Sequence, residues 1–372
     1  MGLAPEMTTL AKMNNSGGNA ECWFLDVGQG ASAVLLLGQG RAIVIDAGPK
    51  ASTVPLQLLK RHVIVIEALI LTHNDADHDG GVARILEAFP KAVRRLFFLV
   101  DRPPAGIKTL RVSQLELANG QLSCQPERLE ACALPQVLFS DPAADIELRL
   151  LYPTFLENLE SQGDADQHNR TSGVLALRCG TRSIVFAGDA NIHAWEAIAS
   201  RMSNYLPLDC DMMTAPHHGA ALCGPRPGAS GSDVNGRNAD AVRKVYSEIM
   251  NPRRVVISAG TSNQHGHPNP ETVAVLRQLG KAVICTQITP QCCDDIESLR
   301  PGIIEPVWPS QSSPSQRLTV AGRSKDVACA GSIIAEISPN QVTLSAWPEH
   351  QLQLDKLAAD GAMRPLCRTL SG

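Results

Sequence analysis

Short apolar runs alternate with amphipathic segments along most of the chain, and glycine-rich turns separate them. Apolar runs of this length predict buried β-strands, whereas apolar positions that recur every three or four residues predict helices. In the first part of the chain we predict strands at residues 22–27, 33–37, 41–46, 63–71 and 93–100, and helices at 53–62 and 80–89. In the second part we predict strands at 146–152, 173–179, 182–187, 210–214, 254–258 and 282–285, and helices at 192–202, 239–250 and 270–279.

Two separated groups of strands, each flanked by helices, favour one architecture of the α/β class. An αββα sandwich accommodates this order better than a single doubly wound sheet does. We expect a flexible N-terminal segment at 1–20, a main domain at 21–289, and a C-terminal extension at 290–372 with a β-hairpin at 332–337 and 342–346. Within the main domain, the irregular residues 101–145 are expected to be an insertion over the site, and residues 221–237 a mobile loop.

The composition of the chain limits which classes of function and which cellular locations are compatible with it. The chain has 372 residues, 44% of them hydrophobic, so it can bury a full core. The net charge of -4 provides no global basic field, so any contact with nucleic acid must rely on a local patch. No apolar stretch reaches roughly eighteen residues, which argues against a membrane span. Without a secretion signal, and with an odd count of 11 cysteines, we expect reduced thiols and a cytoplasmic location.

The segment from Thr72 to Gly81 concentrates metal-binding chemistry on one short loop. It follows an apolar strand and contains His73, Asp75, Asp77 and His78. Crowded carboxylates repel one another, and divalent cations relieve this by binding carboxylates and neutral imidazoles. His73 and Asp75 can converge on one metal, and Asp77 and His78 can face a second. A solvated polar loop is the alternative, but this spacing, followed by two glycines, makes it the poorer explanation.

Seven motifs occur in the order seen in metallo-β-lactamase-fold hydrolases. They are Phe24-Leu25-Asp26-Val27-Gly28-Gln29-Gly30, Ile45-Asp46-Ala47-Gly48, Thr72-His73-Asn74-Asp75-Ala76-Asp77-His78-Asp79-Gly80-Gly81, Asn169-Arg170-Thr171-Ser172, Phe186-Ala187-Gly188-Asp189, Ala215-Pro216-His217-His218-Gly219 and Gly266-His267-Pro268. Over residues 21–285 the chain most resembles the soluble domain of DNA-internalisation competence proteins of the ComEC type. The resemblance implies two mixed sheets flanked by helices. Competence proteins also carry transmembrane channel segments, which this chain lacks, so we expect a free-standing relative.

The resemblance implies roles for residues outside the first loop. Asp189 is expected to bridge two metals, a role compatible with capping the helix that follows. One histidine of the Pro216–Gly219 turn should complete the second metal site. We favour His217, so that His218 is left to hydrogen-bond or to meet substrate.

His267 stands just before a helix start in which Asn269 is the N-cap and Pro270 the first helical residue. Anions bind at such helix ends. We therefore assign His267 to substrate phosphate contact or proton donation, with metal ligation as the second choice and a capping role as the alternative. The candidate catalytic residues are Asp77, His218 and His267.

The chain departs from the family at three points. Asp75 stands where many members have histidine, and Ala31 replaces an aspartate after the Gly-Gln-Gly turn. A third histidine of the first metal site is replaced by Asn169 and Ser172, which fit the competence-type pattern and are expected to bind substrate. His168 is a possible substitute ligand, one position away. More oxygen ligands favour harder metals, so we expect two divalent ions, Mn²⁺ or Zn²⁺, with Mg²⁺ possible.

These observations predict a dinuclear metal-dependent phosphodiesterase, a nuclease acting on DNA through a metal-activated water. One alternative is a small-molecule hydrolase of the same fold, acting on a cyclic nucleotide or an acyl bond. Another is a non-catalytic partner subunit of a bacterial defence-type system. Neither partner proteins nor a homodimer can be derived from the residues.

Several cysteines are not part of these motifs. Among Cys285, Cys292, Cys293 and Cys329, the pair Cys292-Cys293 beside Asp294-Asp295 could join Cys329 in a structural zinc site. Two of them are adjacent, which is not the usual C-x-x-C spacing, and we therefore favour packing or free thiols.

Overall fold

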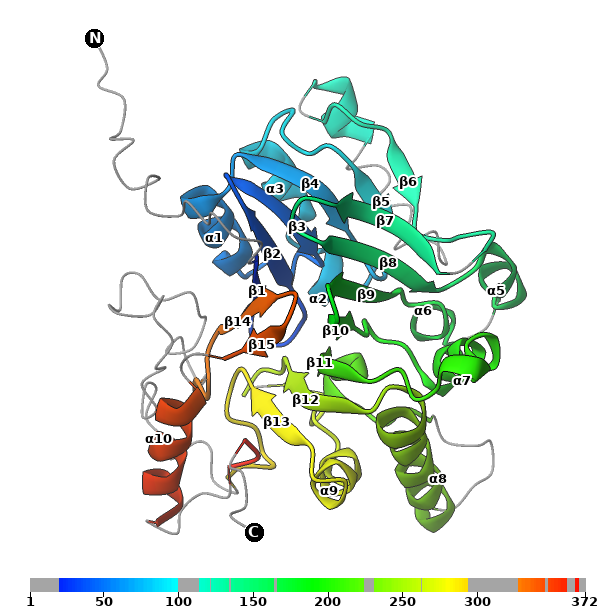
Figure 1. The fold of residues 1–372 in the computed structure, drawn as a ribbon, viewed down its shortest axis with the longest axis vertical. Coiled ribbons are helices and arrows are strands. Elements are labelled where there is room, and N and C mark those ends of the chain that lie inside the picture. Colours follow the sequence, from blue (N-terminus) through cyan, green and yellow to red (C-terminus); the bar gives the residue numbers. More distant parts are fainter. Residues whose placement is uncertain are drawn as a thin grey trace.

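The structure is a computed structural model of the chain, which describes residues 20–99, 114–120, 122–133, 135–163, 166–223, 231–261, 263–293, 327–344, 347–359 and 365–367. Two mixed sheets lie face to face (Figure 1). The first has the order β15-β14-β1-β2-β3-β4-β5-β6 and the second the order β13-β12-β11-β10-β9-β8-β7. This confirms the expected αββα sandwich with two mixed sheets.

The strands of the first sheet are β1 (Ala20–Phe24), β2 (Ala33–Gly38), β3 (Arg41–Ile45), β4 (Val65–Ile70), β5 (Leu96–Phe98), β6 (Pro126–Arg128), β14 (Ile333–Ser338) and β15 (Gln341–Thr343). Those of the second are β7 (Gln136–Asp141), β8 (Ile146–Tyr152), β9 (Val174–Cys179), β10 (Arg182–Phe186), β11 (Cys210–Thr214), β12 (Pro252–Ile257) and β13 (Ala282–Cys285). In each sheet an antiparallel part adjoins a parallel part: β3, β4, β5 and β6 run parallel in the first, and β10 to β13 in the second.

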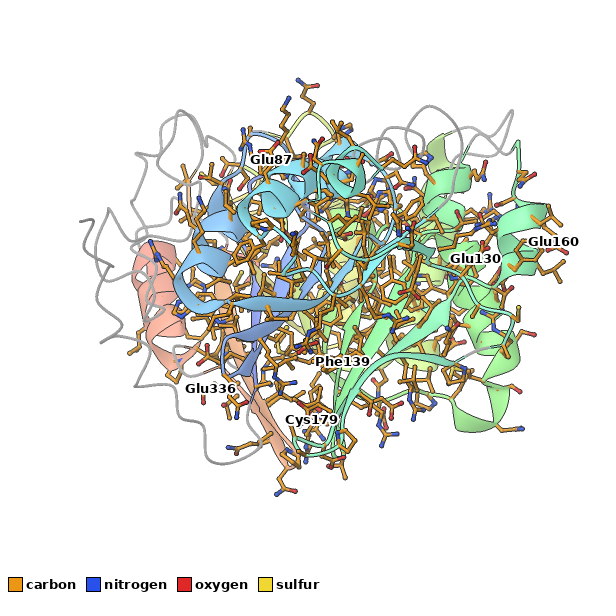
Figure 2. All side chains as sticks on the ribbon, turned by 90° about the horizontal axis from the view of Figure 1, so that it is seen from above. Glu87, Glu130, Phe139, Glu160, Cys179 and Glu336 are labelled. Atoms are coloured by element: carbon orange, nitrogen blue, oxygen red, sulfur yellow. The ribbon has the colours of Figure 1, made fainter. Side chains whose placement is uncertain are left out.

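The helices are α1 (Val54–His62), α2 (Ala76–Asp79), α3 (Val82–Ala88), α5 (Phe155–Glu160), α6 (Gln167–Arg170), α7 (Ile192–Arg201), α8 (Gly231–Arg243), α9 (Pro270–Gln278) and α10 (Trp347–Ala359). The 3₁₀ turn η3 (Pro216–Gly219) follows β11, and the π-helical segment η4 (Lys244–Ile249) continues α8. Helices flank both sheets, and Figure 2 shows from above how side chains fill the space between the layers.

The two-residue period of the strands sorts the core into two regions. Ile184 and Met212 face the space between the sheets, whereas their neighbours Val185 and Met213 face the helices on the other side. The parallel strands β10 to β13 of the second sheet are therefore apolar on both faces, as expected for strands covered on both sides. This explains why they appear in the sequence as continuous apolar runs without alternation.

Two expectations about irregular segments were wrong. Residues 101–145 were expected to be an insertion over the site, but β6 and β7 lie within them and form edge strands of the two sheets. Residues 221–237 were expected to be a mobile loop, yet helix α8 already begins at Gly231. The strands β6 and β7 have little apolar periodicity because they are short and lie at the edges of the sheets. The start of α8 has little apolar periodicity because it contains glycine and polar residues. Residues 100–113 and 224–230 lie outside the described residues.

The C-terminal hairpin is confirmed, and it joins the first sheet. β14 pairs antiparallel with β1, for example Cys22 with Ala335, and β15 forms the sheet edge. In the part of the chain described here, no helix is long and apolar enough to cross a membrane.

Burial along β4 predicts a position-dependent effect on stability. Ile66 in this strand is 0% exposed, whereas Ile64, just before it, is 62% exposed. We expect Ile66→Ala to lower the free energy of unfolding by about 2–5 kcal/mol through cavity formation. Ile64→Ala, the matched control, should cost less than about 0.5 kcal/mol. Urea denaturation followed by circular dichroism measures both, and equal costs would contradict the placement of β4.

Candidate metal centre

The candidate ligands lie where parallel strands of both sheets end. His73 follows β4 and Asp189 follows β10, while His217 and His218 stand on η3 after β11. Because the carboxyl ends of neighbouring parallel strands meet at one edge of a sheet, side chains carried just beyond them converge. The face-to-face packing of the sheets brings the two edges together, and the ligands collect there.

Close backbone packing fixes the first loop. Asp77 and His78 lie on the single-turn helix α2, which is pressed against the loop after β3. The backbone N–H of Ala47 donates to the carbonyl of His78 at 2.7 Å. A Cβ on Gly81 would lie 2.3 Å from the carbonyl oxygen of Ala47. The two glycines of the motif are therefore required so that α2 can approach this loop and direct its side chains inward.

One group of ligand atoms forms around His73. Its Nε2 lies 3.5 Å from Oδ2 of Asp189 and 3.8 Å from Oδ2 of Asp75. His168, on α6, places its Nε2 3.5 Å from the same Asp75 oxygen. His73 is fully buried, whereas Asp75 is partly exposed. This group therefore opens toward solvent on the side of Asp75 and His168.

A second group forms around His78. Its Nε2 lies 3.1 Å from Oδ1 of Asp189 and 3.4 Å from Nε2 of His218. Nε2 of His218 in turn lies 3.3 Å from Oδ2 of Asp77. Ligand atoms of Asp77, His78 and His218 lie within 4.8 Å of one another, as do those of His73, His78 and Asp189.

Asp189 therefore has one oxygen beside each group. Its side chain is almost fully buried, and its backbone N–H donates to Oγ of Ser172 at 2.9 Å. The preceding Gly188 has a φ of 50°, and a Cβ there would lie 2.5 Å from the same Ser172 oxygen. Glycine at this position allows Asp189 to point between the two groups.

The histidine beside Asp77 and His78 is His218, which corrects the preference for His217. Both residues have left-handed backbones, with φ of 49° and 55°, so their side chains diverge. His218 is 3% exposed, and its Nδ1 donates to the carbonyl of Ser258 at 2.8 Å. His217 is 34% exposed, and its Nε2 lies 3.6 Å from Oδ2 of Asp189, on the side of the first group. Sequence could not distinguish two adjacent histidines whose directions depend on an unusual turn.

Asp46 orients this site, a role that the sequence did not reveal. Its Oδ2 accepts a hydrogen bond from Nδ1 of His78 at 2.8 Å, and its Oδ1 accepts one from the backbone N–H of Thr72 at 2.8 Å. The hydroxyl of Thr72 also donates to Oδ2 of Asp46 at 2.8 Å. Asp46 has a φ of 58°, which turns its buried side chain toward the ligand loop. Its position between a strand and Ala47-Gly48 was the available signal.

The expected substrate residues lie at different distances from the ligands. Oγ of Ser172 lies 3.4 Å from Nδ1 of His73, so Ser172 supports the ligands directly. The amide of Asn169 donates to Asp166 at 2.8 Å and is largely buried. The ring of His267 lies 5.3 Å from that of His217. His267 is thus close to the exposed side of the centre.

The hydrogen bonds determine which ring nitrogens face the centre. Nδ1 of His78 donates to Asp46 and Nδ1 of His218 donates to a carbonyl, so both Nε2 atoms hold lone pairs when the rings are neutral. These two Nε2 atoms lie 3.4 Å apart. Facing lone pairs at this distance repel unless a proton or a cation lies between them.

The pKa values of these histidines and of Asp189 depend on two effects, burial and the charges of neighbouring side chains. Burial lowers the pKa of His73 well below its usual value, and the proximity of His78 adds to this. Burial also disfavours protonation of His78, but the carboxylates of Asp189 and Asp46 outweigh burial and raise its pKa. Burial alone would raise the pKa of Asp189, yet His78 and His73 hold it well below its usual range. Burial lowers the pKa of His267 to about 4, helped by His217 and His218.

These residues fit divalent cations. Nε2 of His73 and Oδ1 of Asp189 are buried and make no hydrogen bond. Buried polar atoms without partners are costly, and metal coordination satisfies them. Imidazoles whose Nδ1 atoms are held by a carboxylate or a carbonyl, with Nε2 directed inward, are the usual state of metal-binding histidines. His73, Asp75 and Asp189 could hold one ion, and Asp77, His78, His218 and Asp189 a second.

Comparison with known proteins agrees with this geometry. Residues 26–194 match the family model of the metallo-beta-lactamase superfamily. The predicted resemblance to the metallo-β-lactamase superfamily is confirmed over these residues, which are 169 of the 372 in the chain. That match includes the first ligand loop and Asp189 but ends before His217 and His218.

Relatives of the ComEC type are found among characterised sequences. Recombination protein 2 of Haemophilus influenzae is 44% identical over 72 residues, 18% of this chain and 9% of that protein. Competence protein ComA of Neisseria gonorrhoeae is 23% identical over 268 residues, 71% of this chain and 30% of that protein. The chain thus spans less than a third of the length of either relative. Among solved structures, the diiron β-hydroxylase CmlA of Streptomyces venezuelae aligns with a TM-score of 0.42 at 15% identity, over 71% of this chain and 52% of that one.

Asp46 provides a test of ligand orientation. Asp46→Asn keeps the size of the side chain but removes the charge that holds Nδ1 of His78 as a donor. We expect metal affinity to fall about 10- to 100-fold, the usual effect of losing such a partner. Competitive titration with a metal indicator measures it. Asp211→Asn, at a buried aspartate paired with Arg182 away from the ligands, is the control and should bind normally.

The two adjacent histidines should differ in their effect on metal content. His218→Ala removes a ligand atom from the group with Asp77 and His78, so we expect the protein to lose about one metal equivalent relative to the parent. His217→Ala should retain more metal, because this side chain is more exposed and lies beside Asp189 alone. Elemental analysis after dialysis against manganese decides the question. If His217→Ala loses more metal than His218→Ala, His217 is the ligand, as the sequence suggested.

Proposed function

We propose that the protein is a dinuclear metal-dependent phosphodiesterase, a nuclease that acts on DNA. The observation that carries the proposal is the position of Asp189, whose two oxygens lie beside separate groups of histidines and aspartates. One carboxylate between two such groups is suited to hold two cations at a short, fixed separation. Cations bound there would supply a water of lowered pKa and stabilise charge developing on a phosphate.

Charge balance supports an anionic substrate. Asp75, Asp77 and Asp189 contribute three negative charges, while two divalent cations carry four positive charges. A site that is close to neutral, or slightly positive, can accept a phosphodiester without strong repulsion.

The chain's own residues would hold and orient the reactants. Asp189, whose backbone N–H donates to Ser172, lies between the two groups and would fix the distance between them. The carbonyl of Ser258 holds the ring of His218. His267 lies beside His217 on the more exposed side, and its pKa of about 4 keeps its ring neutral at neutral pH. A neutral ring has one N–H to donate, so His267 would hydrogen-bond a phosphate oxygen of the substrate.

DNA is favoured as the substrate by the relatives. Recombination protein 2 and Competence protein ComA are named for processes that involve DNA, and the similarity to ComA extends over 71% of this chain. The net charge of -4 requires that any groove for DNA be local. A cytoplasmic location, with reduced thiols, is part of the same proposal.

Cleavage assays with matched variants test the proposal. The purified protein with Mn²⁺, Mg²⁺ or Zn²⁺ should cut linear or plasmid DNA. Asp77→Asn combined with His78→Ala should reduce the rate by about 10²-fold or more, since both metal and charge stabilisation are lost. His193→Ala, on the exposed side of α7, should not change the rate. Gel analysis and initial rates provide the measurement.

The outcomes separate the alternatives. Hydrolysis of bis-(p-nitrophenyl) phosphate or of a cyclic dinucleotide without cleavage of DNA would indicate a small-molecule phosphodiesterase. Hydrolysis of a thioester or lactone alone would indicate an acyl hydrolase. Full metal loading without any of these activities would contradict the enzymatic proposal and favour a non-catalytic partner subunit.

A further inference from the structure

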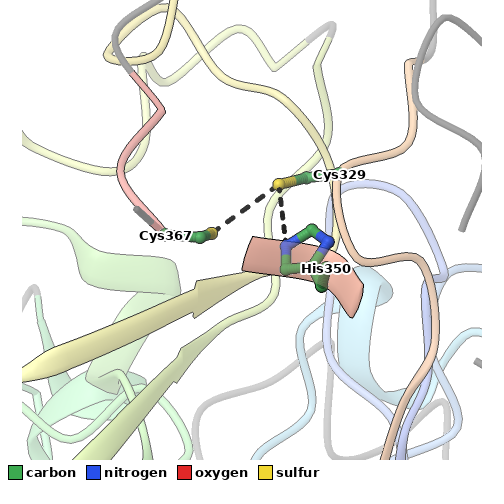
Figure 3. Close-up of side chains that lie close together, drawn as sticks. All are labelled: Cys329, His350 and Cys367. Atoms are coloured by element: carbon green, nitrogen blue, oxygen red, sulfur yellow. Dashed lines mark hydrogen bonds between the residues drawn. The ribbon is translucent and has the colours of Figure 1, made fainter. Parts of the chain in front are cut away.

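A second cluster of metal-ligand side chains lies apart from the centre around Asp189. Cys329 stands just before β14, His350 is on α10, and Cys367 is in a turn after that helix (Figure 3). The three residues are far apart in the sequence, and all are at most 1% exposed. Two thiols and an imidazole that face one another in the protein interior are a set of side chains typical of zinc ligands.

The distances match the edges of a tetrahedral zinc site. Sγ of Cys329 lies 3.6 Å from Sγ of Cys367 and 3.8 Å from Nε2 of His350. Ligand atoms of all three residues lie within 4.8 Å of one another. With Zn–S bonds of about 2.3 Å and Zn–N bonds of about 2.0 Å, a tetrahedron has ligand-to-ligand edges of roughly 3.5–3.8 Å. A disulfide would require about 2.05 Å between the sulfurs, so these thiols are not oxidised to each other.

A fourth thiol adjoins this group at the end of β13, outside the set of three whose ligand atoms all lie within 4.8 Å of one another. Cys285 is fully buried, and its side chain interacts with that of Cys367. Its backbone N–H also donates to Sγ of Cys367 at 2.9 Å. Backbone N–H donors directed at a cysteine sulfur are the outer contacts expected around a metal-bound thiolate. Cys292, by contrast, has its thiol 3.8 Å from the hydroxyl of Thr289.

We propose that Cys329, His350 and Cys367 form a structural zinc site, and that the adjoining Cys285 completes it as the fourth ligand by turning its side chain toward the other three. Three sulfurs and one imidazole are soft and borderline ligands that select zinc over the harder metals suited to the carboxylate-rich centre. Complete burial with four protein ligands is typical of structural sites, which keep no open position for substrate. Of the zinc grouping considered from sequence only Cys329 remains, and Cys285, His350 and Cys367 take the place of Cys292 and Cys293.

The site would join segments that are far apart in the sequence. The chain around Cys329 runs beside the end of β13, where Ala330 donates its backbone N–H to the carbonyl of Cys285 at 3.0 Å. It then continues into β14 of the first sheet. Zinc would therefore fix α10 and the turn at residues 365–367 to the second sheet, close to the point where the chain crosses to the first.

Metal analysis on an altered metal centre tests this assignment. The full chain carrying Asp77→Asn and His78→Ala should still hold a zinc ion with sulfur ligands, because the proposed site does not involve these residues. X-ray absorption at the zinc edge should show a mainly sulfur shell at about 2.3 Å. Cys367→Ser in the same background should lose this zinc. Cys210→Ser, a buried thiol beside the carbonyl of Met250, is the matched control and should keep it.

Three results would overturn the proposal. They are the absence of zinc after purification in zinc-containing buffer, a zinc shell made of nitrogen and oxygen alone, and a Cys329–Cys367 disulfide found by mass spectrometry. If Cys367→Ser does not fold, the absorption spectrum of the Asp77→Asn/His78→Ala protein decides alone. These outcomes are independent of nuclease activity, so failure of one proposal leaves the other intact.

Discussion

The convergence of imidazole nitrogens and carboxylates on the buried Asp189 is the interaction on which the rest of the structure depends. Nε2 atoms of His73 and His78 lie 3.5 and 3.1 Å from its two oxygens, and His218 completes the group. Burial of this many polar atoms is unfavourable unless positive charge is shared among them. The surrounding hydrogen bonds from Asp46, Ser172 and Ser258 do not relieve this cost. They hold the ligands in place while leaving their inner atoms unsatisfied.

The αββα fold explains how such a cluster can persist. The candidate ligands come from loops after β4, β10 and β11, so each is anchored to a strand that is buried in the core. No single loop has to stabilise the cluster by itself. Rigid strands on two facing sheets resist the relaxation that would let the carboxylates and imidazoles move apart.

The sequence predicted best those features whose residues are close together along the chain. The loop after β4 was recognised because His73, Asp75, Asp77 and His78 are close together, and strands β10 to β13 were found because both of their faces are apolar. His218 was assigned less well, since the directions of adjacent side chains on η3 depend on two left-handed residues. The role of Asp46 depends on a contact across 32 positions of the chain, which no local pattern reveals. The group of Cys329, His350 and Cys367 escaped for the same reason, because its spacings resemble no short motif.

The pairing of β1 with β14 has a consequence for how the molecule is made. During synthesis, β1 leaves the ribosome more than three hundred residues before its neighbour does, because Cys22 pairs with Ala335. One edge of the nascent first sheet therefore stays open while almost all of the remaining chain is translated. An exposed strand edge can recruit another chain, so this interval is a period of aggregation risk that a chaperone would shorten. The late hairpin of β14 and β15 acts as the final cover of that edge.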